Sequence, residues 1–383
     1  MTDTGFIYMD NSATTPMSSE AVESMLPYLT TQFGNPSSQH GIGRQAAEAL
    51  NDAREKIASV LECRPSAITF TSGGTEANNL AIKGTWLAGG TGSIVTSAIE
   101  HKSVLAPAAS VSRREGLSHQ VIGVDGEGLI DALSLERVVS SDALICSIMY
   151  ANNEIGSVQP IAEVASLCKE RSIVFHCDAV QAPGLLPIAV DTIGADLISF
   201  SAHKCGGPKG IGLLYRSAKV PLAPQIEGGG QERELRSGTE NVAAIVGMAT
   251  ALEVAESNRL SNVKRLTAQR ERLIAGVLSN VTEAFLTGPR DRRLAHHASF
   301  CFTGISGDAV LQNLEMAGIC CSSGSACSAG EDEASHVLLA IGMDGDVART
   351  SVRFTLSAAT TDAEIDTVIK LVPRAVRSVL SLR

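Results

Sequence analysis

The sequence lacks three features that each mark a class of protein. It has no basic stripe, since 31 Lys and Arg stand against 41 Asp and Glu for a net charge of −10, and we therefore expect no direct binding of nucleic acid. No apolar run approaches the roughly 20 residues that span a membrane. The first residues have neither the basic nor the apolar part of a secretory signal. These absences predict a cytoplasmic protein that does not enter a membrane.

Cysteine pairs with metal-binding or redox spacing are also missing. The nine cysteines are an odd number and form no C-x-x-C pair, which argues against a disulfide framework and against a zinc site. Several lie in apolar, strand-like runs, where a free thiol behaves as a small hydrophobic group. Cys327 differs, because it lies among small polar residues in "SSGSACSAG". It is the thiol to which we assign special chemistry.

The chain alternates short β-rich runs with helical segments between residues 65 and 216. Apolar strands separated by helices predict a mostly parallel sheet with both faces covered. The last two runs are separated only by "HKCGGPK", so the final strand is expected to be antiparallel. The predicted strands are 67–72, 92–98, 143–150, 172–179, 195–202 and 210–216.

A second pattern begins at Thr239, where the apolar spacing becomes helical and continues as a long connecting helix. Strands and helices then follow, and a last helix begins at Thr361 or Asp362. Because 383 residues exceed what one core usually serves, we expect an α/β protein with two domains. The large domain comprises 13–257, and a smaller α+β domain comprises 1–12 plus 258–383, with Cys327 in a loop of about 320–334.

Three groups of residues follow predicted strands and could meet at one edge of the sheet. "FTSGGTEANNLAI" (70–82) reads as strand, glycine loop and helix, which is a possible anion site, although a plain turn explains it equally well. Asp178 and Gln181 follow the next candidate strand, where the carboxylate either caps a helix or pairs with a cation. Lys204 ends the buried strand of "LISFSAHKCGGPKG" (197–210).

Lys204 alone reads as a solvated strand end, but the combination indicates a cofactor. A phosphate loop, a carboxylate and an amine are what pyridoxal phosphate requires, as anchor, ring-nitrogen partner and imine-forming group. In open α/β sheets such ligands bind beyond the carboxyl ends of the strands.

Ten motifs in order make the chain resemble the cysteine desulfurases of the NifS/IscS type. These are pyridoxal-phosphate enzymes of the aspartate-aminotransferase-like fold (fold type I). The motifs are "YMDNSATTP", "GNPSSQHGIGRQA", "TSGGTEANN", "SAIEHKSV", "NNEIGSVQP", "HCDAVQ", "SAHKCGGPKGIGLLY", "GGGQERELRSGTENV", "SSGSACSAG" and "SVRFTLS".

The resemblance implies roles around the cofactor ring. Lys204 forms the internal aldimine, Asp178 pairs with the ring nitrogen, and Gln181 bonds the ring oxygen. His101 stacks on the ring and shuttles a proton, and Asn153 lies near both ring and substrate.

It also implies roles around the phosphate and the substrate. The phosphate is bound by Gly74, Thr75, Ser201 and His203. Thr239 reaches the phosphate in the partner subunit, which implies a homodimer. Arg353 clamps the carboxylate of L-cysteine with help from Asn35.

Cys327 is the nucleophile in this resemblance. Its thiolate attacks the sulfur of L-cysteine, leaving alanine and a persulfide on Cys327. The position of Cys327 relative to Arg353 matches the members that pass this sulfur to a separate acceptor protein. Iron–sulfur cluster assembly, tRNA thiolation and DNA phosphorothioation are the expected pathways.

The sequence is compatible with two other functions. An aminotransferase, or a selenocysteine or cysteine-sulfinate lyase, needs Lys204 and Asp178 but not Cys327. A non-catalytic platform for partner proteins needs none of these residues, so their presence together with His101 and Arg353 argues against it.

Overall fold

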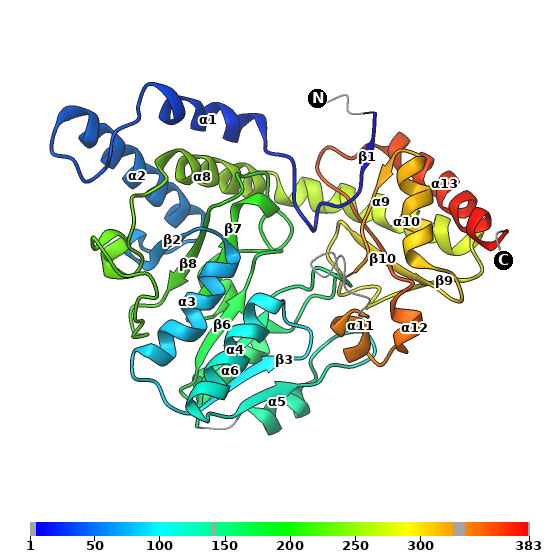
Figure 1. Ribbon diagram of the computed structural model, residues 1–383, viewed down its shortest axis with the longest axis horizontal. Coiled ribbons are helices and arrows are strands. Elements are labelled where there is room, and N and C mark those ends of the chain that lie inside the picture. The colour runs from blue at the N-terminus through cyan, green and yellow to red at the C-terminus, as the bar shows by residue number, and fades with distance from the viewer. Residues whose placement is uncertain (1–4, 140–141, 325–333, 382–383) are drawn as a thin grey trace.

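The computed structural model describes residues 5–139, 142–324 and 334–381. Its centre is a seven-stranded sheet in the order β2-β8-β7-β6-β5-β3-β4 (Figure 1). All neighbouring strands are parallel except β8, which runs antiparallel to β2 and β7. The strands are β2 (Ile68–Thr71), β3 (Ser93–Ser97), β4 (His119–Ile122), β5 (Ala143–Met149), β6 (Val174–Asp178), β7 (Leu197–Ser201) and β8 (Gly212–Arg216).

The predicted α/β fold and the antiparallel last strand are thereby confirmed. Strand β4 was not predicted from the sequence; it is a four-residue edge strand that begins with two polar residues, His119 and Gln120. Such a strand is only partly buried, so its apolar signal is weak.

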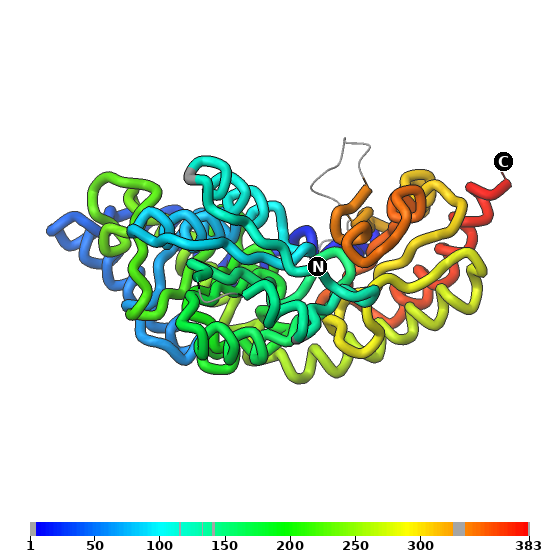
Figure 2. Tube along the Cα trace, turned by 90° about the horizontal axis from the view of Figure 1, so that it is seen from below, coloured from blue at the N-terminus to red at the C-terminus, as the bar shows by residue number. Residues whose placement is uncertain are grey.

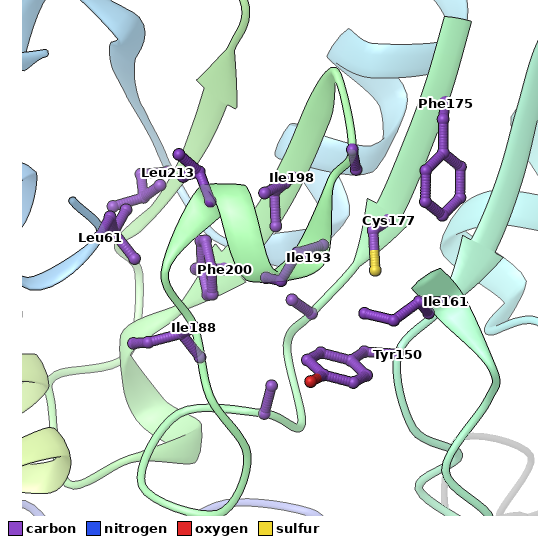
Figure 3. Close-up of a cluster of buried hydrophobic side chains, with 14 of the residues drawn as sticks. Leu61, Tyr150, Ile161, Phe175, Cys177, Ile188, Ile193, Ile198, Phe200 and Leu213 are labelled. Carbon is purple, nitrogen blue, oxygen red and sulfur yellow. The ribbon is translucent and has the colours of Figure 1, made fainter. Parts of the chain in front are cut away.

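Helices cover both faces of this sheet because successive strand residues point to opposite sides. Ile145 and Leu197 pack against α3 and α4. Their sequence neighbours Cys146 and Ile198 pack into the cluster on the other face, with residues of α2, α6 and α8, part of which Figure 3 shows. The helices of this part are α1 (Ser19–Thr30), α2 (Gly41–Val60), α3 (Gly74–Leu87), α4 (Lys102–Glu115), α5 (Ala132–Val138), α6 (Ile161–Glu170), α7 (Val190–Ile193) and α8 (Val242–Ser257).

The rest of the chain forms a second group of elements, whose backbone Figure 2 shows. These elements pack around an apolar cluster of their own. The predicted long helix is two helices that meet at Asn258, and the last helix has the expected cap at Thr361, in a capping box with Glu364. A three-stranded antiparallel sheet has the order β12-β10-β9, and β1 pairs with β11. These elements are β1 (Ile7–Tyr8), α9 (Arg259–Asn280), β9 (Ala284–Leu286), β10 (His297–Phe302), α10 (Gly307–Met316), β11 (Ile319–Cys320), α11 (His336–Ala340), α12 (Gly345–Ala348), β12 (Val352–Thr355) and α13 (Asp362–Leu380).

This second cluster joins the beginning of the chain to its end. Met9 is fully buried in it together with Phe300, Phe354 and Val372. The division into domains at about residues 12 and 257 stays a prediction. No described helix is long and apolar enough to cross a membrane.

The parallel strands deliver side chains to one edge of the sheet. β6 ends at Asp178 and β7 at Ser201, with Lys204 closing the 3-10 turn Ala202–Lys204 that follows. The helix after β3 begins one residue after His101. The carboxyl ends of neighbouring parallel strands thus bring residues from distant parts of the sequence to one place.

Candidate active site

A pocket of about 430 Å³ lies at this edge and contains most of the predicted site residues. Its wall combines strand ends of the large sheet with Arg353 of β12 and with residues before α11. The predicted residues that line it are Gly74, Thr75, His101, Asn153, Asp178, Gln181, Ser201, His203, Lys204 and Arg353.

The first turn of α3 contributes Gly74 and Thr75 to the wall of the pocket. The amides that open a helix have no partner within the helix, so they and the helix dipole favour a negative group. A Cβ atom on Gly74 would lie 2.7 Å from Cγ2 of Val180, so glycine lets the backbone approach without a clash. Ser201 and His203 line the same pocket. Burial and the neighbouring Lys204 lower the pKa of His203 to about 4, which leaves its ring neutral.

Asp178 is buried and is held by two donors. Its Oδ1 accepts from the backbone N–H of Val180 at 3.0 Å, and its Oδ2 accepts from Nδ2 of Asn78 at 2.7 Å. The same amide of Asn78 donates to Oγ of Ser103 at 2.8 Å. A carboxylate oxygen can accept more than one bond, so Asp178 retains capacity for a cationic N–H in the pocket.

His101 is joined to this network through Ser103. Its Nδ1 accepts from the backbone N–H of Ser103 at 3.1 Å, and the Ser103 hydroxyl lies 2.7 Å from the same nitrogen. Burial lowers the pKa of His101, although the nearby Asp178 opposes that shift. The ring is therefore neutral at pH 7. Because Nδ1 accepts the N–H of Ser103, the proton lies on Nε2, which is the nitrogen able to exchange a proton with a ligand.

Lys204 is anchored by backbone oxygens of the N-terminal segment. Nζ donates to the carbonyls of Ser12 at 2.5 Å and Ala13 at 2.7 Å. Nε2 of Gln181 donates to the same carbonyl of Ser12 at 3.1 Å. These acceptors explain why a lysine can end a buried strand: its charge is solvated by oxygens of the chain instead of water.

Arg353 lines the same pocket and is 1% exposed. Its Nη2 donates to Oδ1 of Asp10 at 2.7 Å, and its Nη1 donates to the carbonyl of Asn153 at 3.0 Å. A guanidinium held in a fixed plane suits recognition of a carboxylate.

Several contributors were missed by the sequence analysis. Asn78 and Ser103 lie inside the motifs "TSGGTEANN" and "SAIEHKSV", and Asp10 and Ser12 lie inside "YMDNSATTP". Asn78 is four residues after Gly74 on α3 and so lies on the same face of that helix, which is the one local signal that could have found it.

Glu154 is a further buried acid in the pocket wall. Its Oε2 accepts from the Ser335 hydroxyl at 2.5 Å, and burial raises its pKa. A Cβ on Gly324 would lie 3.1 Å from the same oxygen. Glu154 was not among the residues predicted from the sequence.

Three predicted residues are not part of this pocket as described. Asn35 and Thr239 are exposed and do not line it. Cys327 lies outside the described residues. Gly324 and Ala334, the described residues on either side of 325–333, both line the pocket.

The arrangement fits pyridoxal phosphate. The helix start with Ser201 suits a phosphate, and the buried Asp178 suits the protonated ring nitrogen. Lys204 lines the same pocket and would supply the amine that the aldehyde requires. The chemistry of the donors therefore matches all three ends of the cofactor.

Comparison with known proteins gives one consistent family. Residues 7–368 match the family profile "Aminotransferase class-V". A cysteine desulfurase IscS of Dictyoglomus turgidum is 42% identical over 378 residues, covering 98% of this chain and 96% of the relative.

Solved structures agree. A NifS-like protein superposes with a TM-score of 0.91 at 36% identity, covering 99% of this chain and 100% of its own. SspA in complex with cysteine superposes with a TM-score of 0.79 at 34% identity, covering 91% and 98%. The chain therefore belongs to the class-V aminotransferases, and within them to the cysteine desulfurases, enzymes that depend on pyridoxal phosphate.

Proposed function

We propose that this protein removes sulfur from L-cysteine, releases L-alanine and holds the sulfur as a persulfide on Cys327. The observation that carries the proposal is that Lys204, Asp178, His101 and Arg353 line one and the same pocket. The similarity to SspA, which was solved with cysteine, supports the substrate.

The two ends of the pocket orient the reactants. Arg353 binds the substrate's carboxylate, with Asn153 beside it. At the other end the first turn of α3, with Gly74, holds the phosphate. Bound pyridoxal phosphate supplies an electron sink that weakens the bonds around the substrate's α-carbon.

Two residues handle protons near the reacting carbons. Lys204 is the amine that would hold the cofactor, and once free it can take a proton from the α-carbon. His101, neutral with its proton on Nε2, can give a proton to the substrate and recover one later. Asn78 and Ser103 keep the His101 ring in this state through the contacts described above.

The sulfur transfer itself belongs to Cys327. Its thiolate attacks the substrate's sulfur, so an S–S bond forms as the bond between Cβ and sulfur breaks. The electron pair of the broken bond stays with the substrate carbon, which takes a proton and becomes the methyl group of alanine. The persulfide is then passed to an acceptor protein of iron–sulfur cluster assembly, tRNA thiolation or DNA phosphorothioation.

A homodimer is the second part of the proposal. Val22, Leu26 and Leu29 form one stripe on α1, and each is 46% to 63% exposed. An apolar surface of this kind favours a protein partner. Because Thr239 is exposed and lies outside the pocket of its own chain, a second copy of this chain is the partner that gives it a role.

The test is alanine formation from L-cysteine by the purified protein with a reductant present to discharge the persulfide. Wild type should form alanine with turnover, and Cys327→Ser should bind cysteine with a changed absorbance yet form none. Protein that carries the cofactor but makes no alanine would favour an aminotransferase or a related lyase. Full activity of Cys327→Ser would remove Cys327 from the mechanism.

A further inference from the structure

Arg353 is paired with an acidic residue that no motif role explains. Its Nη2 lies 2.7 Å from Oδ1 of Asp10, whose side chain is 20% exposed against 1% for Arg353. Nη1 donates to the carbonyls of Asn153 at 3.0 Å and Gly324 at 3.5 Å. Among the described residues, Nε meets no hydrogen-bond partner. The guanidinium is thus held by a carboxylate on one nitrogen and by backbone oxygens on the other.

The backbone of Asp10 is fixed against the strand that carries Arg353. Asp10 and Thr355 form a parallel bridge, and the N–H of Thr355 donates to the carbonyl of Met9 at 2.7 Å. The side chain of Asn11 donates to the carbonyl of Thr355, also at 2.7 Å. A rigid segment therefore delivers the carboxylate of Asp10 to Arg353.

The same segment contacts the reacting end of the pocket. The carbonyls of Ser12 and Ala13 accept from Nζ of Lys204. Residues 10–13 thus connect Arg353, which is expected to bind the carboxylate, with Lys204, whose amine is expected next to the reacting carbon. A shift of this segment at Arg353 would change the distance between Arg353 and Lys204.

We propose that Asp10 is a positioning residue for the carboxylate of the substrate. It acts through Arg353, by holding the guanidinium in the plane that receives a carboxylate. A buried guanidinium needs a counter-charge, and Glu154 is a second acid among the described residues that interacts with it. Without Asp10, the side chain of Arg353 turns toward Glu154 and away from the substrate. The inference rests on the proposed function only in taking an amino acid as substrate.

The test compares two amines that differ only in the carboxylate, L-alanine and ethylamine. Binding of each is measured from the absorbance change of the holoenzyme. Asp10→Asn should weaken the binding of L-alanine about tenfold, equivalent to ~1.4 kcal/mol. The dissociation constant of ethylamine should stay within about twofold of the wild-type value. The matched control is Asp346→Asn, which removes an exposed acid paired with Arg349 at 2.6 Å and should change neither.

Steady-state kinetics give a second readout. In Asp10→Asn the KM for L-cysteine should rise by a similar factor with kcat within about twofold, because the lost interaction is made in the ground state and the transition state alike. Equal weakening of both amines, unchanged or tighter binding of L-alanine, or a loss of kcat at constant KM each overturns the proposal.

A second variant covers the case in which Asp10→Asn does not retain the cofactor. Asp10→Glu keeps the charge, but its side chain is one carbon longer and must therefore move the guanidinium of Arg353. The affinity for L-alanine should change at least about threefold, whereas the affinity for ethylamine should not change. No change in the affinity for L-alanine also overturns the proposal. If wild type forms no alanine from cysteine, the proposed function fails, whereas the comparison of the two amines still tests Asp10.

Discussion

Nδ2 of Asn78 lies 2.7 Å from Oδ2 of Asp178, although 100 residues separate the two along the chain. The same nitrogen lies 2.8 Å from Oγ of Ser103, which contacts His101 in turn. One amide therefore orients both the acid expected beneath the ring nitrogen and the histidine expected over the ring.

Asn78→Ala should weaken cofactor binding about tenfold, since it removes a hydrogen bond to a charged, buried group. The measurement is the dissociation constant of pyridoxal phosphate, followed by absorbance. Asn79→Ala is the control, because Nδ2 of Asn79 donates to the carbonyl of Thr75 within the same helix. Equal cofactor affinity in both variants would show that Asn78 does not support Asp178.

Lys204→Ala should abolish the yellow colour of the purified protein, because the amine that bonds the cofactor's aldehyde is gone. The absorbance spectrum after dialysis checks this. Lys209→Ala, five residues further along the chain and past the 3-10 turn, is the control and should keep the colour. A yellow Lys204→Ala protein would overturn the assignment of Lys204.

The free energy of unfolding should decrease as the pH is lowered below about 6.5, because His176 stays neutral inside the sheet. It is fully buried, with Ser147 Oγ 2.7 Å from Nδ1 and Ser199 Oγ 2.9 Å from Nε2. Burial lowers its pKa to about 3, whereas in the unfolded chain the pKa is about 6.5. Between these values the unfolded state binds the extra proton, so acidification favours unfolding.

From pH 7.5 to 5.0 this one residue should cost about 2 kcal/mol of the free energy of unfolding. Urea titration of the holoenzyme at both pH values measures it, and His176→Gln should lose about 2 kcal/mol less than wild type over the same range. An identical pH dependence in wild type and His176→Gln would contradict the argument.

Glu232→Gln should destabilise the protein by about 3 kcal/mol, because it leaves a buried arginine without its counter-charge. Glu232 binds Arg54 with both carboxylate oxygens, at 2.5 and 3.0 Å, and also accepts from the N–H of Phe70. It lies in a turn of three consecutive residues with positive φ. This backbone conformation is unfavourable by itself and persists only where contacts with the surrounding structure stabilise it.

The matched change is Glu253→Gln, which breaks an exposed ion pair with Lys56 at 2.8 Å. It should cost less than about 1 kcal/mol, since water and salt screen such pairs. Chemical unfolding of both variants gives the comparison, and equal costs would show that Glu232 is not an anchor.

Local pattern was sufficient for the strands of the large sheet other than β4, and it placed Asp178 and Lys204 at or just past strand ends. The apolar runs ending at Asp178 and Ser201 are fully buried strands, as their composition indicates. The roles of Lys204 and Gly74 at the cofactor came from the family resemblance, because the local signal of a glycine loop fits a plain turn equally well. Edge strand β4 was not predicted because partial burial leaves little apolar signal. The break at Asn258 was not predicted because the two helices share the same periodicity.

The contacts among distant residues depended on the tertiary structure. Asp10 and Arg353 are 343 positions apart, and Ser12 reaches Lys204 only because the N-terminal segment runs along β12. By itself, the sequence determined which residues are buried and which types of group end each strand, since periodicity reports the buried face. Which of those groups meet was decided by the strand order and by the packing of the two apolar clusters, because a hydrogen bond depends on distances that no local pattern contains.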